Sequence, residues 1–300
     1  MLITKKQKQE HVENLEKMPR RHSQWTDVIR RLTRDKLAMV GLVIVIVLIF
    51  ITLFAKVIAP YDYSAQDLTN KFQMPDRHHI MGTDNYGRDL FSRILVGGQI
   101  SLLVALIAVV MALVIGGALG ATAGYFGGIY EVIVMRLLDI LMAIPGLLLA
   151  VAVSAALGTG TMNTALAVSI GSIPSSARIL RATVLTIREQ EYVEAARATG
   201  SNDMRIIMKH ILPNTLAPLI VDTTLRIGGC IMQISGLSFV GLGVQPPTPE
   251  WGSILSSGRE YVRDFWPLVI FPGAAIMLTM FGFNVLGDGL RDALDPKLKQ

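Results

Sequence analysis

The sequence predicts an all-α, polytopic membrane protein with six transmembrane helices, cytoplasmic N- and C-termini, and a cytoplasmic helical hairpin between the fourth and fifth helices. Two observations predict this fold: the length of the uncharged runs and the uneven distribution of Lys and Arg. Only 17% of the 300 residues are charged and the mean hydropathy is +0.48, whereas a soluble domain carries about 25% charged residues. Low charge combined with long apolar runs is typical of membrane-embedded chains.

The transmembrane helices follow from the apolar runs. A bilayer core requires about 20 apolar residues in a helix. The uncharged stretch 140–177 is too long for one helix, so we divide it at Gly158-Thr159-Gly160. We expect six spans, over residues 37–55, 100–123, 131–156, 162–182, 214–236 and 266–286. Residues 100–286 then form the core of helices two to six, which includes the loop 188–213, and residues 56–99 form an external loop.

The Lys and Arg residues set the predicted orientation. Nineteen of the 28 lie before Leu37, around the loop after the fourth helix, or in the tail 287–300. Seven lie in the loops on the opposite side, and Arg136 and Arg226 lie within spans. Because cytoplasmic loops carry the excess of Lys and Arg, both termini and the hairpin are predicted to be cytoplasmic.

The N-terminal segment 1–36 is polar and basic, and no small-residue cleavage site follows the first apolar run, so we interpret that run as an uncleaved anchor. Four apolar residues recur at helical spacing before it: Trp25, Val28, Ile29 and Leu32. This pattern with flanking arginines predicts an interfacial helix on the inner leaflet. An ordinary solvated arm is the alternative.

The hairpin sequence is EYVEAARATGSNDMRIIMKHILPN, residues 191–214. Four of its first residues fall at i, i+3, i+4 and i+7 and are expected to share one helical face: Tyr192, Ala195, Ala196 and Thr199. Acidic residues occupy the early turns, where the positive end of a helix favours them. Gly200 is predicted to end this helix in a left-handed conformation.

A second short helix is predicted to follow, with Ser201 or Asn202 as its N-cap and Asp203 in its first turn. Its apolar stripe consists of four residues expected to pack against the bundle or the membrane: Met204, Ile207, Met208 and Ile211. Pro213 is expected to end it just before the fifth span. Two short helices joined by a fixed bend would form a rigid, small-sided projection on the cytoplasmic face.

This hairpin resembles the EAA signature of the membrane subunits of ABC importers. The sequence has Glu194-Ala195-Ala196, three residues, Gly200, nine residues, and then His210-Ile211-Leu212-Pro213, with His210 where isoleucine is usual. The resemblance implies that the hairpin couples to an ATP-binding subunit by docking into its cleft. The residues expected to carry this contact are Tyr192, Glu194, Ala195, Ala196, Arg197, Thr199 and Gly200.

Four further segments resemble the C-type permease of dipeptide and oligopeptide importers, in the peptide and nickel family with the type I fold. They are GTDNYGRDLFSR (82–93), MRLLDILMAIPGLLLA (135–150), GLGVQPPTPEWG (241–252) and GDGLRDALDPKLKQ (287–300). The resemblance implies a permease in the bacterial cytoplasmic membrane, paired with a homologous permease, two ATP-binding subunits and an external substrate-binding protein. Nickel chelates and glutathione are alternative substrates within the same family.

The sequence contains no G-x-x-x-x-G-K-[ST] motif, so it has no phosphate-binding loop of that kind. We therefore expect no catalytic residue and no cofactor on this chain, with ATP and Mg bound by partner subunits. A proton-coupled secondary carrier is an alternative, but such carriers often show inverted repeats, and no convincing repeat is present. A structural or scaffold membrane protein is a third reading.

Charged residues within spans are costly and suggest function. Arg136 and Asp139 are three residues apart in the third span, and Asp222 and Arg226 are four residues apart in the fifth. Each pair could neutralise itself on one helix face. Alternatively, these residues line the substrate pathway, where Asp222 and Arg226 would contact a zwitterionic solute, or they relay protons.

The external loops give weaker signals. Leu90, Phe91, Ile94 and Leu95 form one apolar face, which predicts a helix lying along the outer interface. Asp84 beside Arg88, and the adjacent pair His78-His79, are poor ligand sets, so no metal site is expected. Trp251 is expected to anchor the last external loop at the membrane interface. The single cysteine, Cys230, excludes an internal disulfide, and we interpret it as a small buried residue.

Overall fold

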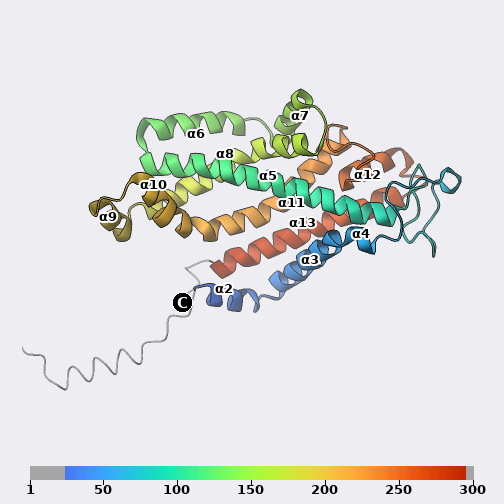
Figure 1. Ribbon diagram of the computed structural model, residues 1–300, viewed down its shortest axis with the longest axis horizontal. Helices are drawn as coiled ribbons and strands as arrows, with labels where there is room; N and C mark the ends of the chain where they lie inside the picture. Colours follow the sequence, from blue (N-terminus) through green and yellow to red (C-terminus); the bar gives the residue numbers. More distant parts are fainter. Residues whose placement is uncertain (1–23, 295–300) are drawn as a thin grey trace, which may run out of the picture.

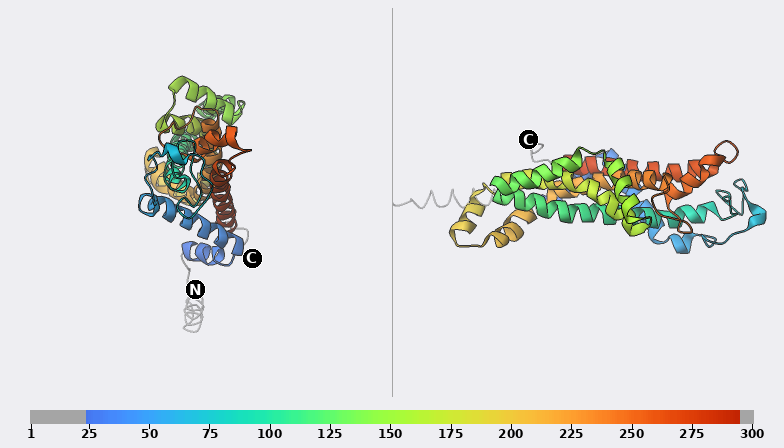
Figure 2. Two further views of the ribbon diagram at one scale, coloured as in Figure 1. Left: turned by 90° about the vertical axis from the view of Figure 1, so that its right-hand side faces the viewer. Right: turned by 90° about the horizontal axis from the view of Figure 1, so that it is seen from above.

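The computed structural model describes residues 24–294, which excludes most of the predicted N-terminal arm and the last six residues. This part of the chain is helical, and within it the only β-type pairing is an isolated bridge between Thr83 and Asp89. Most of the long helices run roughly along one axis of an elongated molecule (Figures 1 and 2). The prediction of an all-α protein is therefore confirmed.

The helices fall into long and short groups. The long ones are α3 (Lys36–Leu53), α5 (Leu90–Phe126), α6 (Gly128–Met142), α7 (Gly146–Leu157), α8 (Thr161–Ile187), α11 (Leu216–Phe239) and α13 (Pro267–Leu294). The short ones are α2 (Gln24–Leu32), α4 (Ala55–Ile58), η1 (Leu68–Asn70), α9 (Glu191–Ala198), α10 (Asp203–Ile206), η2 (Ile207–Ile211), η3 (Leu212–Thr215), α12 (Trp251–Gly258) and η4 (Arg259–Tyr261).

Four helical stretches are long and apolar enough to cross a membrane: Lys36–Leu53, Leu90–Phe126, Asp203–Phe239 and Pro267–Leu294. The bent pair α6–α7 makes five if it counts as one span. Helix α8 is not among them, because its 27 residues include many hydroxyl side chains and two arginines. The described chain thus has the composition of a multi-pass protein, while six crossings stay a prediction.

The prediction of one helix over 131–156 is wrong. Helix α6 ends at Met142 and α7 begins at Gly146, and the two axes are bent by 90°. Pro145 lacks a backbone N–H and disfavours the helical conformation in the preceding residue, which favours a break at this position. The bend turns α7 against α8 (Figure 1).

The centre of the bundle is the contact between α5 and α8, which is the most extensive of any helix pair in the described chain. It depends on small residues. A Cβ atom on Gly120 would lie 2.1 Å from the Ala177 carbonyl oxygen, and one on Gly116 would lie 2.5 Å from the Ile173 oxygen. Only glycine permits this approach of the two backbones. Helices α11, α12 and α13 complete the main core cluster around α5 and α8.

Helix α3 packs along α13 at one side of the bundle. It begins after Asp35, whose carboxylate accepts the backbone N–H of Leu37 at 2.9 Å and of Ala38 at 3.3 Å, as an N-cap residue does. Gly41 allows close contact, since a Cβ there would lie 2.7 Å from the Leu286 nitrogen. Helix α2 also packs against α13. The side chain of Trp25 lies outside the described part of the structure, so the interfacial position of this helix stays a prediction.

The helix predicted along the outer interface is not a separate element. Helix α5 begins at Leu90 and continues without a break for 37 residues. Its first turn is capped by Asp89, whose carboxylate accepts the Ser92 N–H at 2.7 Å. Leu90 and Ile94 are buried among residues of α11, α12 and α13, and Leu95 packs with Ala55. Protein therefore covers the apolar face that was assigned to the membrane.

The prediction that Trp251 anchors a loop at the membrane interface is also wrong. Its side chain is 2% exposed, and its indole N–H donates to the Ile94 carbonyl oxygen at 2.9 Å. The neighbouring Glu250 is fully buried, where its carboxylate caps α12 and accepts the Ser101 hydroxyl at 3.1 Å. A buried indole N–H requires a hydrogen-bond partner, and here the partner is on α5. These two hydrogen bonds fix the start of α12 to α5.

Candidate functional site: the hairpin and the charges of the bundle

The hairpin between α8 and α11 lies at one end of the bundle, and loop 59–89 lies at the other (Figure 1). Its first arm is α9, with Glu191 and Glu194 in the first turn. Val193 and Ala196 face inward and are 0% and 8% exposed. Ala196 therefore does not lie on the exposed surface that its spacing predicted. The exposed residues of the predicted docking set are Tyr192, Glu194, Ala195, Arg197, Thr199 and Gly200.

The bend of the hairpin forms as the sequence predicts. Gly200 has φ +81°, and no atom lies within 4 Å of the position a Cβ would take. The Ser201 N–H returns to the Ala196 carbonyl oxygen at 3.1 Å, which closes the end of α9. Asn202 is the N-cap of the second arm and accepts the Arg205 N–H at 2.9 Å. The bend is thus fixed by backbone conformation and by a cap.

The prediction that Pro213 ends the second arm is wrong. Helical structure runs from α10 through the π-helical η2 and the 3-10 helix η3 directly into α11. A proline ring and its missing N–H disrupt regular α-helical bonding, and wider or tighter turns accommodate that disruption. The Asn214 side-chain amide donates to the His210 carbonyl oxygen at 2.6 Å. The second arm therefore continues α11, with no separate joint between them.

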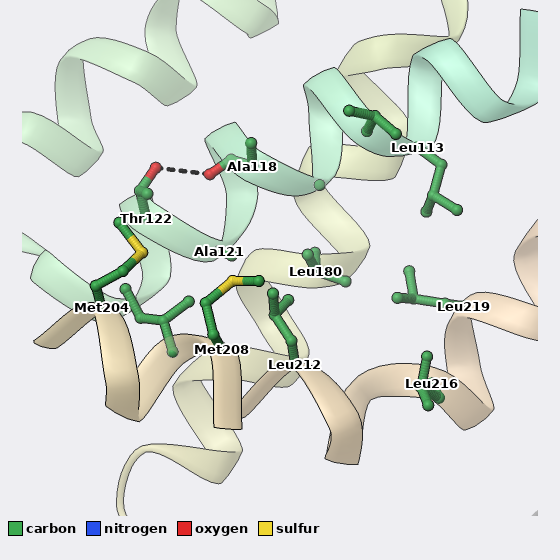
Figure 3. A pocket seen from close by; sticks show the side chains of 13 residues that line it. Leu113, Ala118, Ala121, Thr122, Leu180, Met204, Met208, Leu212, Leu216 and Leu219 are labelled. Carbon is green, nitrogen blue, oxygen red and sulfur yellow. Dashed lines mark hydrogen bonds between the residues drawn. The ribbon is translucent and has the colours of Figure 1, made fainter. Parts of the chain in front are cut away.

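The apolar stripe of the second arm divides into two parts. Ile207 and Ile211 are buried, together with Ile206, which the spacing did not select. Met204 and Met208 are 64% and 55% exposed. They lie at the wall of an apolar cavity of about 410 Å³ between α5, α8 and the second arm (Figure 3). The stripe is therefore only half buried.

Contacts with the end of α5 hold the hairpin in place. The Tyr125 hydroxyl donates to Asp203 Oδ1 at 2.6 Å, and the Arg197 guanidinium lies 5.7 Å from the centre of the Tyr125 ring. Arg188, just before α9, donates to the Gly124 carbonyl oxygen at 2.8 Å. Sequence reasoning missed these contacts. The only available signal was that Arg197 and Asp203 are charged residues within short helices.

The ion pair between Asp222 and Arg226 forms on α11 as expected. The Arg226 Nη2 lies 2.6 Å from Asp222 Oδ1, and the two side chains are 16% and 17% exposed, respectively. Arg226 also donates to the Ser175 hydroxyl on α8 at 2.7 Å. The same face of α11 holds Cys230, which is buried and 1% exposed, so its interpretation as a packed residue is confirmed.

The self-paired arrangement predicted for Arg136 and Asp139 is wrong. Asp139 pairs with Arg178 of α8 at 2.7 Å, and both side chains are about half exposed. Glu131, in the first turn of α6, pairs with Arg181 of α8. Two ion pairs between helices therefore join α6 to α8. Arg136 is exposed, and no carboxylate of the described residues lies within ion-pair distance of it.

At the opposite end, loop 59–89 is held by buried charges. Arg88 Nε lies 2.6 Å from Asp84 Oδ2, and Arg93 Nε lies 3.4 Å from the same oxygen. His79 Nδ1 lies 2.9 Å from Asp89 Oδ1. These side chains serve one another in ion pairs, and residues 24–294 hold no group of three His, Cys, Asp or Glu side chains suited to a metal.

An exposed turn of the same loop carries Asp67. Hydrogen bonds from the Thr69 hydroxyl and N–H, and from the Asn70 side chain, hold the pKa of the Asp67 carboxyl below its ordinary value. The carboxylate is favoured because these donors bond to its charged form. The loop therefore has a defined fold of its own outside the helical bundle.

Comparison with known proteins identifies the family. A family model described as binding-protein-dependent transport system inner membrane component matches residues 116–300. A second, described as the N-terminal TM domain of oligopeptide transport permease C, matches residues 23–75. Together the two matches extend over most of the chain, including the hairpin.

Curated relatives agree. The chain is 44% identical to the dipeptide transport system permease protein DppC of Alkalihalophilus pseudofirmus over 277 residues, covering 92% of this chain and 91% of the relative. It is 45% identical to the glutathione transport system permease protein GsiD of an Escherichia coli strain, and 46% identical to GsiD of Shigella sonnei. Both GsiD matches also cover 92% of this chain and 91% of the relative.

Two solved structures of the MetNI methionine ABC transporter in inward-facing conformations share the fold, with TM-scores of 0.54 and 0.55 at 20% identity. They cover 68% and 67% of this chain and 96% of each matched chain. The recognition of an importer permease from the EAA-type hairpin is thus confirmed. The chain belongs to the family of binding-protein-dependent transport system inner membrane components, in its peptide-permease branch, and is a permease subunit of an ABC importer.

Proposed function

We propose that this chain is the C-type permease of an importer that moves dipeptides or oligopeptides across the bacterial cytoplasmic membrane. ATP is hydrolysed by two separate ATP-binding subunits, which bind the nucleotide and Mg, and this chain holds no cofactor. The observation that carries the proposal is the position of the EAA-type residues. They lie on an exposed helix, α9, at the end of the bundle and next to an arm that continues into α11.

Six crossings are proposed, by α3, α5, the α6–α7 pair, α8, α11 and α13. Helix α8 is assigned as a crossing although it is less apolar than the others, because it runs alongside α5 for most of its length. The C-terminal end of α13 and the hairpin lie toward the same end of the molecule (Figure 1). This agrees with termini and hairpin on the cytoplasmic side. A homologous permease pairs with this chain, and an external binding protein delivers substrate.

The hairpin is the proposed coupling element. Its exposed docking residues surround Ala195, whose small side chain allows a close approach by the ATP-binding subunit. Helix α9 is fixed by the Gly200 bend and by its buried side, so a push on it moves α8 and α11 as rigid elements. The chain's part in transport is therefore a conformational step without covalent chemistry.

Asp222 and Arg226 are proposed to face the substrate pathway, together with Arg136 and Asp139. The pair on α11 is partly exposed and presents both signs of charge, which suits a zwitterionic solute. Arg136 is exposed, and Asp139 is half exposed although it pairs with Arg178. Exposed charges on a helix of a membrane protein are expected to face an aqueous path or a partner subunit.

Peptides are the preferred substrate class because the relatives include a dipeptide permease and the N-terminal segment matches an oligopeptide permease domain. Glutathione permeases are equally similar to this chain, so glutathione is the second candidate. Nickel chelates are the remaining option from the resemblance. A proton-coupled carrier would have to transport without any ATP-binding subunit.

The test is reconstitution. The tagged chain is expressed with its neighbouring permease, ATP-binding and binding-protein genes, purified, and placed in proteoliposomes. We expect co-purification of two ATP-binding subunits, and ATPase activity that rises at least threefold with binding protein and a dipeptide. Stimulation by glutathione alone, or by a nickel chelate alone, would reassign the substrate. Proton-driven uptake by the isolated chain would contradict the proposal.

A size series at Ala195 tests the docking surface. Ala195→Gln places a long side chain on α9 and is expected to reduce uptake at least tenfold and weaken co-purification of the ATP-binding subunits. Ala195→Ser keeps the residue small and is the control, with uptake within twofold of the parent. Normal assembly and uptake with the Gln variant would exclude α9 as the docking element.

A further inference from the structure

Tyr125 connects the hairpin to a helix that is not adjacent to it in the chain. Its side chain is 7% exposed at the end of α5 and packs among Val193, Ala196 and Ile206 of the hairpin. The Tyr125 side chain is thus enclosed by both arms of the hairpin. Spacing in the sequence does not predict this contact, because Tyr125 lies far from the hairpin along the chain.

Each arm also presents a charged group to the same ring. Asp203, at the start of the second arm, accepts the Tyr125 hydroxyl at 2.6 Å. Arg197, on the first arm, places its guanidinium carbon 5.7 Å from the ring centre. A hydrogen bond to a carboxylate is short and stronger than a neutral one, and a cation over an aromatic face is attracted to it. One side chain therefore fixes both arms relative to α5.

The adjacent corner between α5 and α6 is fixed to α8 by two further contacts. Arg188 donates to the Gly124 carbonyl oxygen at 2.8 Å, and Arg181 pairs with Glu131 of α6. Gly127 and Gly128 turn the chain between the two helices with positive φ values of 67° and 61°. The corner is therefore a short, backbone-defined turn bonded to the segment that enters the hairpin.

Chain connectivity alone would pass movement of the hairpin only to α8 and α11. We propose that Tyr125 is a positioning residue that passes this movement to α5 and, through the corner at 127–128, to α6. The inference rests on the proposed coupling function. The hydroxyl fixes the angle between hairpin and α5, so the bent α6–α7 pair moves together with α8 and α11.

The test is Tyr125→Phe in the assembled complex, because it removes the hydroxyl and keeps the ring that Arg197 and the apolar residues contact. We expect complex assembly and basal ATPase within twofold of the parent, and substrate transported per ATP hydrolysed reduced at least threefold. Tyr130→Phe is the matched control. Its hydroxyl bonds to Thr122 of α5 at 3.0 Å near the same corner, which is a bond within the α5–α6 corner and not to the hairpin, so the amount of substrate transported per ATP should not change.

A second readout follows the corner itself. Hydrogen exchange of residues 124–131 should change when a non-hydrolysable ATP analogue binds the parent complex, and Tyr125→Phe should abolish at least half of that change. Asp203→Asn removes the charge of the group that accepts the Tyr125 hydroxyl. It is expected to lower the substrate transported per ATP and to reduce the exchange response in the same way. It therefore tests the inference if Tyr125→Phe does not assemble. A parental transport ratio and a parental exchange response in the assembled variants would overturn the inference.

The two levels of the proposal fail separately. If Ala195→Gln transports normally, the hairpin is not the docking element and the coupling function itself is wrong. If Ala195→Gln loses transport while Tyr125→Phe and Asp203→Asn match the parent, coupling stands and only the link through α5 is wrong.

Discussion

Arg226 on α11 bonds to Asp222 one turn earlier, with its Nη2 2.6 Å from one carboxylate oxygen and its Nε 3.1 Å from the other. A third nitrogen of the same guanidinium donates to Ser175 on α8 at 2.7 Å. The pair is therefore both a local i, i+4 contact and a link between two helices of the core. Because the pair is partly buried, each charge would be costly without the other to neutralise it.

Removing one member of this pair should be more harmful than removing both. Asp222→Asn leaves the Arg226 charge without its partner, and we expect a loss of about 3 kcal/mol in the free energy of unfolding. Asp222→Asn combined with Arg226→Gln removes both charges and should cost less. Thermal unfolding of the purified complex in detergent measures which variant is less stable.

The same double variant tests the pathway assignment. If the two charges contact the substrate, the complex should assemble normally while its substrate-stimulated ATPase falls several-fold. Stimulation equal to that of the parent would leave the pair a purely structural role. Equal destabilisation by the single and double variants would show that the two side chains are not energetically coupled.

The packing of α5 on α8 predicts different effects for two neighbouring glycines. Gly120→Ala places a Cβ 2.1 Å from the Ala177 carbonyl oxygen, whereas Gly117→Ala places one 3.5 Å from Leu180 Cδ2. Because backbone atoms cannot yield as a side chain does, we expect the first change to destabilise by about 2 kcal/mol. The Gly117 variant should stay within about 0.5 kcal/mol of the parent. Similar unfolding temperatures would contradict the close packing.

Substitution of two tryptophans should affect stability to different extents. Trp251→Phe removes the indole N–H that bonds to Ile94 and leaves a cavity at a 2% exposed site, so we expect a loss of about 2 kcal/mol. Trp266 is 45% exposed, and its replacement by Phe should change stability little. Unfolding followed by the remaining tryptophan fluorescence checks the contrast. A neutral Trp251→Phe would contradict the buried bond.

At Gly200 the bend of the hairpin depends on backbone conformation. Gly200 has φ +81° and open space around it, so Gly200→Val meets no clash but forces a β-branched residue into the left-handed region, at about 1–2 kcal/mol. Asn tolerates that region better, so Gly200→Asn is the control. We expect uptake to fall several-fold with Val and less than twofold with Asn. Full uptake with Val would mean that the bend is not a rigid element.

The features that sequence reasoning found depend on residues close together in the chain. The apolar runs are continuous stretches of the chain, and the Gly200 stop, the Asn202 cap and the Asp222–Arg226 pair each lie within one or two helical turns. Their physical causes are local: a left-handed glycine, a side chain bonding to a nearby N–H, and two charges on one face. The hairpin motif was recognisable for the same reason, because its residues lie close together in the sequence.

The features that it missed involve partners far apart in the chain. Asp139 pairs with a residue 39 positions away, Tyr125 with one 78 away, and Trp251 bonds to one 157 away. Arg136 lies one helical turn from Asp139, yet it is not its partner, because Arg178 on a packed neighbouring helix lies closer to the carboxylate. Spacing along one helix cannot show which of two possible partners forms the ion pair.

The amino-acid order therefore determined the apolar helices and the glycine-bent hairpin, because hydrophobicity and backbone conformation act along the chain, and the hairpin motif indicated the permease family by resemblance. The packing of helices decided which side chains the hairpin contacts, which arginine pairs with Asp139, and which tryptophan is buried. Those outcomes depend on close contacts between distant segments, which exist only after the bundle has formed.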